Sequence, residues 1–376
     1  MVSSISNLQV ALANLQSTTS QSGGFDFSIF AQGSSGSSSI YSGANAKVAL
    51  DNAEKNKDKS IAQLQKDPQI QKDIARYTEV VQNAKSLDDV LNDPVARKVL
   101  MTANGLGQYV DSVGLAKKAM MSDPSDSNSL AAKLQGTDSG WLQFAQTYDI
   151  PKYGIDRLSP QINGYSGRWN VTIQREGKPL TAELDITNTK GAVTATINGT
   201  QIPASIDANN NITLDIIYDG TDGGTHLSHL TGTLGKDGVS MSGLQTDDGA
   251  KLDQSWSAAP LFANSIKEVT DNYLNEKWLD QLDKQLPGLG SAVTFKNSAS
   301  TFDTTVKVLG SPLGREVVTT ALSIPKQIAL QSIEAQEKAV DAKLDVSQLK
   351  NPDYVDRLVQ RYLMQLNGGS SGGVTA

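Results

Sequence analysis

The hydrophobic pattern of this chain changes from a helical period to a strand period near Asn163, and returns to a helical period near Leu261. On both sides of that segment, apolar residues recur three and four positions apart among strong helix formers. Within 163–260 they alternate with polar residues between turns rich in Gly, Asn and Asp. A chain that changes period twice in this way is expected to be mainly helical with one inserted β domain.

The segment 163–260 predicts about eight short amphipathic strands joined by tight turns. An open sheet of this length would expose its edges, so we expect an antiparallel meander that forms a small barrel or sandwich. The "GRW" opening and the Trp of the closing strand resemble small ligand-carrying barrels of the lipocalin and avidin type. Leu, Ile and Trp residues that face inward usually fill such a small barrel. If it held a ligand instead, the first residues to consider would be Trp169, Tyr218 and Trp256.

A repeated helix start lies on either side of the β segment. "VLNDPVARKVLMTA" at 90–103 returns as "VLGSPLGREVVTTA" at 308–321, with roughly half of the positions identical. Asp93 and Ser311 are N-cap residue types, and the following proline suits the first helical position. Looser copies surround Pro68 and Pro352. The tight pair predicts one helical domain of two related halves, divided in sequence by the β domain.

The chain is therefore expected to be α+β, with a discontinuous mainly helical domain and an inserted small antiparallel β-barrel or sandwich. The expected parts are a flexible N-terminal segment (1–45), the first helical half (46–162), the β domain (163–260), the second helical half (261–366) and a flexible tail (367–376).

The N-terminal segment contains a short apolar seam of helical spacing, formed by Ile5, Leu8, Leu12 and Leu15. Two turns of seam cannot hold a coiled coil alone. The seam either docks on its own domain or becomes helical only against neighbouring subunits. A Ser/Gly-rich linker follows, interrupted by the apolar cluster Phe25, Phe27, Ile29 and Phe30.

Composition limits the partners and the chemistry. The formal net charge of −7 and the absence of a basic run argue against nucleic acid and anionic membranes as partners. The chain has no cysteine, which excludes disulfides, thiol nucleophiles and Cys–metal sites. The N-terminus does not have the basic opening and continuous apolar core of a Sec signal peptide, and no apolar run reaches the length of a membrane span.

Catalytic and metal-binding motifs give no candidate residues. The two histidines, His226 and His229, are three apart, so in a strand they point to opposite faces. "DANNN" at 207–211 begins like a calcium loop but has Ile212 at its sixth position, and is expected to be a hairpin turn. No nucleophile elbow or phosphate loop occurs. We expect no enzyme, no cofactor and no metal.

A family resemblance comes from the helical parts. "LNDPVARKVLMTANGLG", "MMSDPSDSNSLAAKL" and the later helix beginning "NPDYVDRLVQRYL" resemble an uncharacterised alphaproteobacterial family encoded among flagellar genes. The layout is also similar to flagellar axial proteins such as rod, hook and flagellin, which carry terminal helices and an inserted β domain. This chain departs from them by ending in "GGSSGGVTA" rather than a heptad helix, which favours an accessory role.

The resemblance implies an exported structural or accessory component of the bacterial flagellum, secreted by the flagellar type III route and acting through subunit packing. Its expected partners are flagellar proteins or other copies of itself, with a flagellar export chaperone before assembly. It would be cytoplasmic before export and flagellar or extracellular after it. The alternative is a protein that uses the lipocalin-like barrel to carry a small apolar molecule or a sugar.

Overall fold

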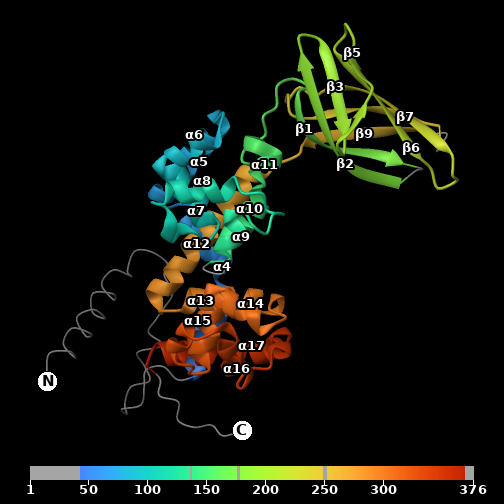
Figure 1. Cartoon of the computed structure of the whole chain (residues 1–376). Helices are drawn as coiled ribbons and strands as arrows, with labels where there is room; N and C mark the ends of the chain where they lie inside the picture. Colours follow the sequence, from blue (N-terminus) through green and yellow to red (C-terminus); the bar gives the residue numbers. More distant parts are fainter. Residues whose placement is uncertain (1–42, 136–137, 176–177, 249–251, 369–376) are drawn as a thin grey trace, which may run out of the picture.

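The chain folds into an elongated helical body with a β-barrel at one end (Figure 1). The computed structural model describes residues 43–368, apart from 136–137, 176–177 and 249–251. Helices come both before and after the barrel in sequence, yet their buried apolar residues form one continuous core. The predicted α+β architecture, a discontinuous helical domain with an inserted barrel, is confirmed.

The barrel is built from nine antiparallel strand segments. They are β1 (Gly167–Arg175), β2 (Lys178–Thr189), β3 (Ala192–Ile197), β4 (Thr200–Ile202), β5 (Ala204–Ile206), β6 (Asn211–Asp219), β7 (Thr225–Leu234), β8 (Met241–Asp247) and β9 (Leu252–Pro260). Their order is β4-β3-β2-β1-β9-β8-β7-β6-β5, so neighbours in sequence are neighbours in space and β1 pairs with β9.

Pro203 divides what is otherwise one strand into β4 and β5. Proline has no N–H to donate to a ladder, so the pairing is interrupted there. The first part pairs with β3 and the second with β6, while the Pro203 carbonyl accepts a hydrogen bond from the Asp215 N–H at 3.1 Å. The bent strand therefore connects the two edges of the sheet, and the barrel is nearly closed.

Alternate residues of the strands fill the barrel, as the sequence pattern predicts. Buried inward side chains come from every strand segment except β5, whose Ala204 and Ile206 pack at the margin of the core. The buried set includes Trp169, Val171, Ile173, Ala182, Leu184, Ile186, Ala195, Ile202, Ile212, Leu214, Ile216, Leu230, Met241, Trp256 and Ala258. The barrel core is separate from the core of the helical body.

The helical body has two lobes joined by the long helix α12 (Ser265–Gln285). Lobe 1 contains α4 (Lys57–Leu64), α5 (Pro68–Asn83), α6 (Leu87–Asn92), α7 (Pro94–Ala103), η1 (Gly107–Tyr109), α8 (Val113–Met120), α9 (Leu130–Leu134), α10 (Gly140–Tyr148), α11 (Ile150–Tyr153) and η2 (Gly154–Arg157). Lobe 2 contains α3 (Gly43–Lys55), α13 (Leu289–Ser298), η3 (Ala299–Thr301), α14 (Thr305–Gly310), α15 (Pro312–Ala321), η4 (Lys326–Leu330), α16 (Ile333–Asp341), η5 (Val346–Lys350) and α17 (Pro352–Leu366).

The two lobes exchange a helix across the barrel insertion. Helix α3, which precedes the barrel, packs against α13 and α17 of lobe 2. Helix α12, which follows the barrel, packs against α4 and α7 of lobe 1 before it reaches α13. The division between the lobes therefore does not coincide with the β segment, because each lobe needs one helix from the other side of it.

The repeated helix start is confirmed as a repeated structure. Asp93 ends α6 and caps α7, accepting hydrogen bonds from the N–H groups of Val95 and Ala96 at 3.0 and 2.8 Å. Ser311 ends α14 and caps α15 in the same way, accepting from the Gly314 N–H at 3.1 Å. In both copies proline occupies the first helical position. The looser caps, Asp67 and Asn351, also accept two backbone hydrogen bonds each.

The structural repeat extends beyond the residues that show it in sequence. Each copy ends with a residue of positive φ, Gly105 at 70° and Ser323 at 50°. The next N–H then returns to a carbonyl five residues back: Leu106 to Met101 at 2.9 Å, and Ile324 to Thr319 at 2.8 Å.

The last helices of the two lobes are also related. "LNEKWLDQL" of α12 matches "LVQRYLMQL" of α17, and α12 packs on α7 as α17 packs on α15. The barrel therefore interrupts the first copy of the repeat before its last helix. No helix in the described part of the chain has the length and hydropathy needed to cross a membrane.

Candidate functional site

The predicted subunit-packing seam, Ile5, Leu8, Leu12 and Leu15, lies outside the described residues. The structure shows where this segment joins the body. Helix α3 begins at Gly43 and packs on α13 and α17, so the described part of the chain begins in lobe 2.

Trp169 and Trp256, two of the three residues proposed for a ligand, are part of the barrel core. Their side chains are 0% and 2% exposed. The indole N–H of Trp169 donates to the Tyr165 carbonyl at 2.9 Å, and that of Trp256 donates to the Thr231 carbonyl at 3.0 Å. A Cβ on Gly232 would come within 2.5 Å of the Trp256 ring, so the ring lies directly on the backbone of β7. Both rings therefore pack within the wall and core of the barrel.

The third residue, Tyr218, lies at the opposite end of the barrel from Trp169. We call the end where the chain enters at Gly167 and leaves at Pro260 the entry end, and the other the far end. Tyr218 pairs with His226 near the end of β6, and its hydroxyl is 2.8 and 3.0 Å from the two carboxylate oxygens of Asp247. The register thus keeps Tyr218 and Trp169 apart rather than bringing the three residues together around one cavity.

Tyr218 belongs to a set of inward polar residues at the far end, which we call the far-end cluster: Tyr218, Ser228, Gln245, Asp247 and Gln254. Ser228, Gln245 and Asp247 are almost completely buried. The Ser228 hydroxyl donates to Asp247 at 3.1 Å and accepts from the Gln245 amide at 3.1 Å. The Gln254 side-chain oxygen is buried without a hydrogen-bond partner. Apart from that oxygen, the cluster is paired by its own members and by the Gln174 backbone, whose N–H donates to the Gln245 side-chain oxygen at 2.8 Å and whose carbonyl accepts from the Gln245 amide.

Apart from Tyr218, the far-end cluster was not predicted, because only the apolar residues of each alternation were expected to face inward. Ser228 is in phase with Leu230, and Gln245 and Asp247 are in phase with Met241. Polar residues at inward positions near a strand end were the available signal.

His226 lies beside this cluster and bridges two turns. Its Nε2 is 2.9 Å from Asp222 and its Nδ1 is 3.2 Å from Asp248. The hydrogen bond to Asp222 is the main cause of a raised His226 pKa, with the Asp248 carboxylate adding to it. His229 lies on the other face of the strand and contacts Asp215 at 2.6 Å, which confirms the predicted opposite orientation.

The expected hairpin turn at "DANNN" is confirmed. The Asp207 carboxylate accepts from the backbone N–H groups of Asn209 and Asn211 at 2.9 and 2.8 Å. Asn210 adopts a positive φ of 61° between them. The carboxylate is thus used to hold the turn between β5 and β6.

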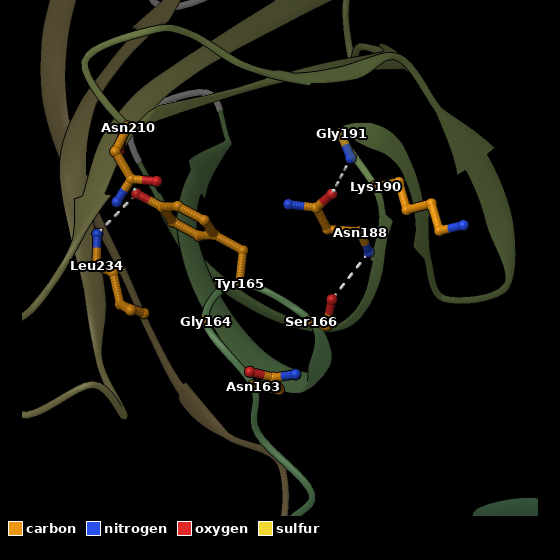
Figure 2. Close-up of a pocket in the computed structure, with 9 residues that line it drawn as sticks. All are labelled: Asn163, Gly164, Tyr165, Ser166, Asn188, Lys190, Gly191, Asn210 and Leu234. Carbon is orange, nitrogen blue, oxygen red and sulfur yellow. Dashed lines mark hydrogen bonds between the residues drawn. The ribbon is translucent and has the colours of Figure 1, made fainter.

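A hollow of about 390 Å³ lies at the entry end (Figure 2). Tyr165 separates it from the barrel interior, because its hydroxyl donates to the Asn210 carbonyl at 2.7 Å and accepts from the Leu234 N–H at 2.9 Å. Polar turn residues line the rest: Asn163, Gly164, Ser166, Asn188, Lys190 and Gly191. Tyr165 was not predicted, since it precedes the alternating run and sits in the tight turn bridged between Asn163 and Ser166.

A family model described as a protein of unknown function (DUF1217) matches residues 103–161 and 250–355. The matched segments contain helices from both sides of the barrel and omit strands β1 to β8. No curated protein matches the chain.

Among solved structures, the chain is similar to the crystal structure of protein AGR_C_984 from Agrobacterium tumefaciens. The match has a TM-score of 0.50 at 13% sequence identity, and covers 86% of this chain and 94% of that one. At this identity the similarity concerns the fold alone.

Proposed function

We propose that the protein is an exported structural or accessory component of the bacterial flagellum, which acts by packing against neighbouring subunits. The observation that supports this most is the position of the barrel. It is inserted through two paired neighbouring strands, β1 and β9, and stands at one end of an elongated helical body (Figure 1). Such a layout leaves the helical body available for assembly while the barrel contacts the surroundings.

In this mechanism the N-terminal seam of Ile5, Leu8, Leu12 and Leu15 becomes buried against a neighbouring subunit. Burial of four aliphatic side chains is favourable only in the assembled state, because a seam of two turns is too short to stay helical in water. Partners would be other flagellar proteins or further copies of the chain. A flagellar export chaperone would hold the chain in the cytoplasm before its export by the flagellar type III route.

The export step is tested by locating the protein in cells. We expect it in culture supernatant or purified flagella of the parent strain, and its loss from both when the flagellar export gate is deleted. A Sec-exported protein of the same cells is the control for general secretion. Cytoplasmic retention in both strains would refute the proposal.

The packing step is tested with the double substitution Leu8→Ser and Leu12→Ser. Incorporation into flagella should be abolished while the melting temperature of the purified chain stays within about 1 °C, because in this mechanism the seam becomes buried only on assembly. A large loss of stability would show that the seam docks on its own domain instead.

The alternative function, carriage of a small ligand by the barrel, is favoured by one observation at the far end. The Gln254 amide oxygen is buried beside hydroxyl and amide groups without a partner, and an unpaired buried acceptor is costly unless something donates to it. Such surroundings suit a sugar better than an apolar molecule. Native mass spectrometry of the purified protein should then show a bound mass, which Tyr218→Phe should weaken; protein of unmodified mass alone would count against this alternative.

A further inference from the structure

The outer surface of lobe 2 exposes three large apolar side chains on neighbouring elements. Val306 on α14, Leu330 at the end of η4 and Ile333 at the start of α16 are 51%, 89% and 44% exposed. We call these three residues the outer patch. Single exposed apolar residues are ordinary, but a group on adjoining helices marks a contact surface.

The internal repeat relates the outer patch to the equivalent place in lobe 1. In lobe 1, Asp88 is the second residue of α6 and forms an ion pair with Lys117, the fifth residue of α8, at 2.6 Å. Val306 is the second residue of α14, and Glu337 is the fifth residue of α16. Because α14 packs on α16 as α6 packs on α8, Val306 and Glu337 are the positions equivalent to the Asp88–Lys117 pair.

Ile333 lies one helical turn before Glu337 on the same face of α16, and Leu330 is the last residue of η4. The three apolar residues therefore lie on α16 and on two elements, α14 and η4, that both pack on it.

The surface at α16 in lobe 2 can be compared with the equivalent surface at α8 in lobe 1. Lobe 1 has a charged pair, Asp88 and Lys117, where lobe 2 has Val306 beside α16. Lobe 1 also covers α8 with α9 and α10, whereas the elements of lobe 2 that pack on α16 are α14 and η4. The two repeats therefore differ at these helices. In lobe 2, fewer elements pack on α16 than pack on α8 in lobe 1, and the surface is more apolar.

The chain itself contains a segment suited to cover the outer patch. The seam formed by Ile5, Leu8, Leu12 and Leu15 is apolar along one side, and no charged residue precedes Asp26. It is joined to α3 of lobe 2 by the 27 residues 16–42. A flexible linker of that length has a root-mean-square span of roughly 30 Å, which is enough to reach an adjoining molecule.

We propose that the N-terminal seam of a second copy docks as a helix on the outer patch, with its leucines between α14 and α16. This inference rests on the proposed function, since it names the surface through which subunits pack. Each chain then donates one seam and accepts another, a head-to-tail contact that continues from subunit to subunit.

The absence of cysteine allows a direct test in the full-length chain. Leu8→Cys and Val306→Cys are made as two separate single-cysteine proteins, mixed at micromolar concentration and oxidised, and disulfide-linked heterodimer is followed on non-reducing gels. The matched control replaces Val306→Cys by Val239→Cys, because Val239 is a valine of similar exposure, 48%, on the β7–β8 turn of the barrel.

The docked pair should cross-link at least about tenfold faster than the control pair, because docking raises the local thiol concentration. Adding Ile333→Ser to the Val306→Cys protein should reduce that advantage. Equal rates for the two pairs would overturn the proposal. So would a disulfide that forms only within one chain of a Leu8→Cys, Val306→Cys double variant, which would make the occupant the chain's own seam.

The two proposals fail separately. Rapid heterodimer formation together with cytoplasmic retention in cells would leave the docking contact standing and refute the flagellar role. Export that depends on the flagellar gate, together with equal cross-linking rates, would keep the flagellar role and refute the outer patch as its docking surface.

Discussion

Asp93 should stabilise the α6–α7 junction mainly as a helix cap and only secondarily as an ion-pair partner. Its carboxylate accepts from the N–H groups of Val95 and Ala96, and it is 2.8 Å from the guanidinium of Arg76. Removing an N-cap costs about 1 kcal/mol, and a pair with a half-exposed arginine adds about 0.5 kcal/mol. Asp93→Ala should therefore cost about 1.5 kcal/mol, and Asp93→Asn, which keeps the cap, about 0.5 kcal/mol.

Ser311 provides the matched comparison in the second copy of the repeat. It caps α15 through one hydrogen bond from Gly314, so Ser311→Ala should cost about 1 kcal/mol. Because barrel and helical body have separate cores, global unfolding is not a single two-state transition. The assay is therefore native-state hydrogen exchange of the first-turn amides of α7 and α15, where 1.4 kcal/mol corresponds to about tenfold faster exchange through local opening.

The stabilisation of the α6–α7 junction by Asp93 should also depend on pH. Burial alone would raise the Asp93 pKa, but the Ala96 N–H and Arg76 outweigh it and hold the pKa below its usual 3.8. The carboxylate therefore stabilises the junction fully above pH 3.8, and this contribution is lost as the pH falls through the lower folded pKa. Asp93→Asn exchanging as fast as Asp93→Ala at pH 7 would refute the reasoning, because it would show that the ion pair and not the cap holds the junction.

Two further outcomes concern the barrel. Tyr165→Phe should destabilise the barrel by about 0.5–1.5 kcal/mol, because it removes the hydrogen bonds to the Asn210 carbonyl and the Leu234 N–H; tryptophan fluorescence during urea unfolding measures this, and no shift in midpoint would contradict it. His226 should titrate above the ordinary histidine pKa of 6.5, since the hydrogen bond to Asp222 raises its pKa. The bridge then stabilises the turn fully below pH 6.5 and is lost as the pH rises through the folded value; histidine ring NMR measures the titration, and a His226 midpoint at or below 6.5 would refute the bridge.

Structural features that depend only on residues close together in the sequence could be predicted. An N-cap and a proline specify a helix start within four residues, so Asp93 and Ser311 could be recognised without knowing what α7 and α15 pack against. Strand alternation likewise identified inward residues such as Leu184 and Leu214, because a period of two is set by the backbone itself.

The arrangement of the helices could not be read in the same way. That α12 completes lobe 1 depends on which apolar faces fit together, and α12 has apolar residues around much of its circumference. One contact that fixes it, the Tyr273 hydroxyl on the buried Asp73 carboxylate at 2.7 Å, joins residues 200 positions apart. Tyr165 was not predicted for a related reason, since its two hydrogen-bond partners, in the β5–β6 turn and at the end of β7, lie far along the chain.

The exchange of helices between the lobes has a consequence for the order in which the protein can mature on the ribosome. The face of α7 that packs on α12 stays uncovered from the time Ala103 is made until Gln285 has been added. At 5–20 residues per second this interval is roughly ten to forty seconds. The barrel is complete at Pro260 and can close within that interval. The barrel, which is inserted into lobe 1 in the sequence, thus folds first. Lobe 1 is completed later, and its exposed apolar face must be kept from association until α12 has been made.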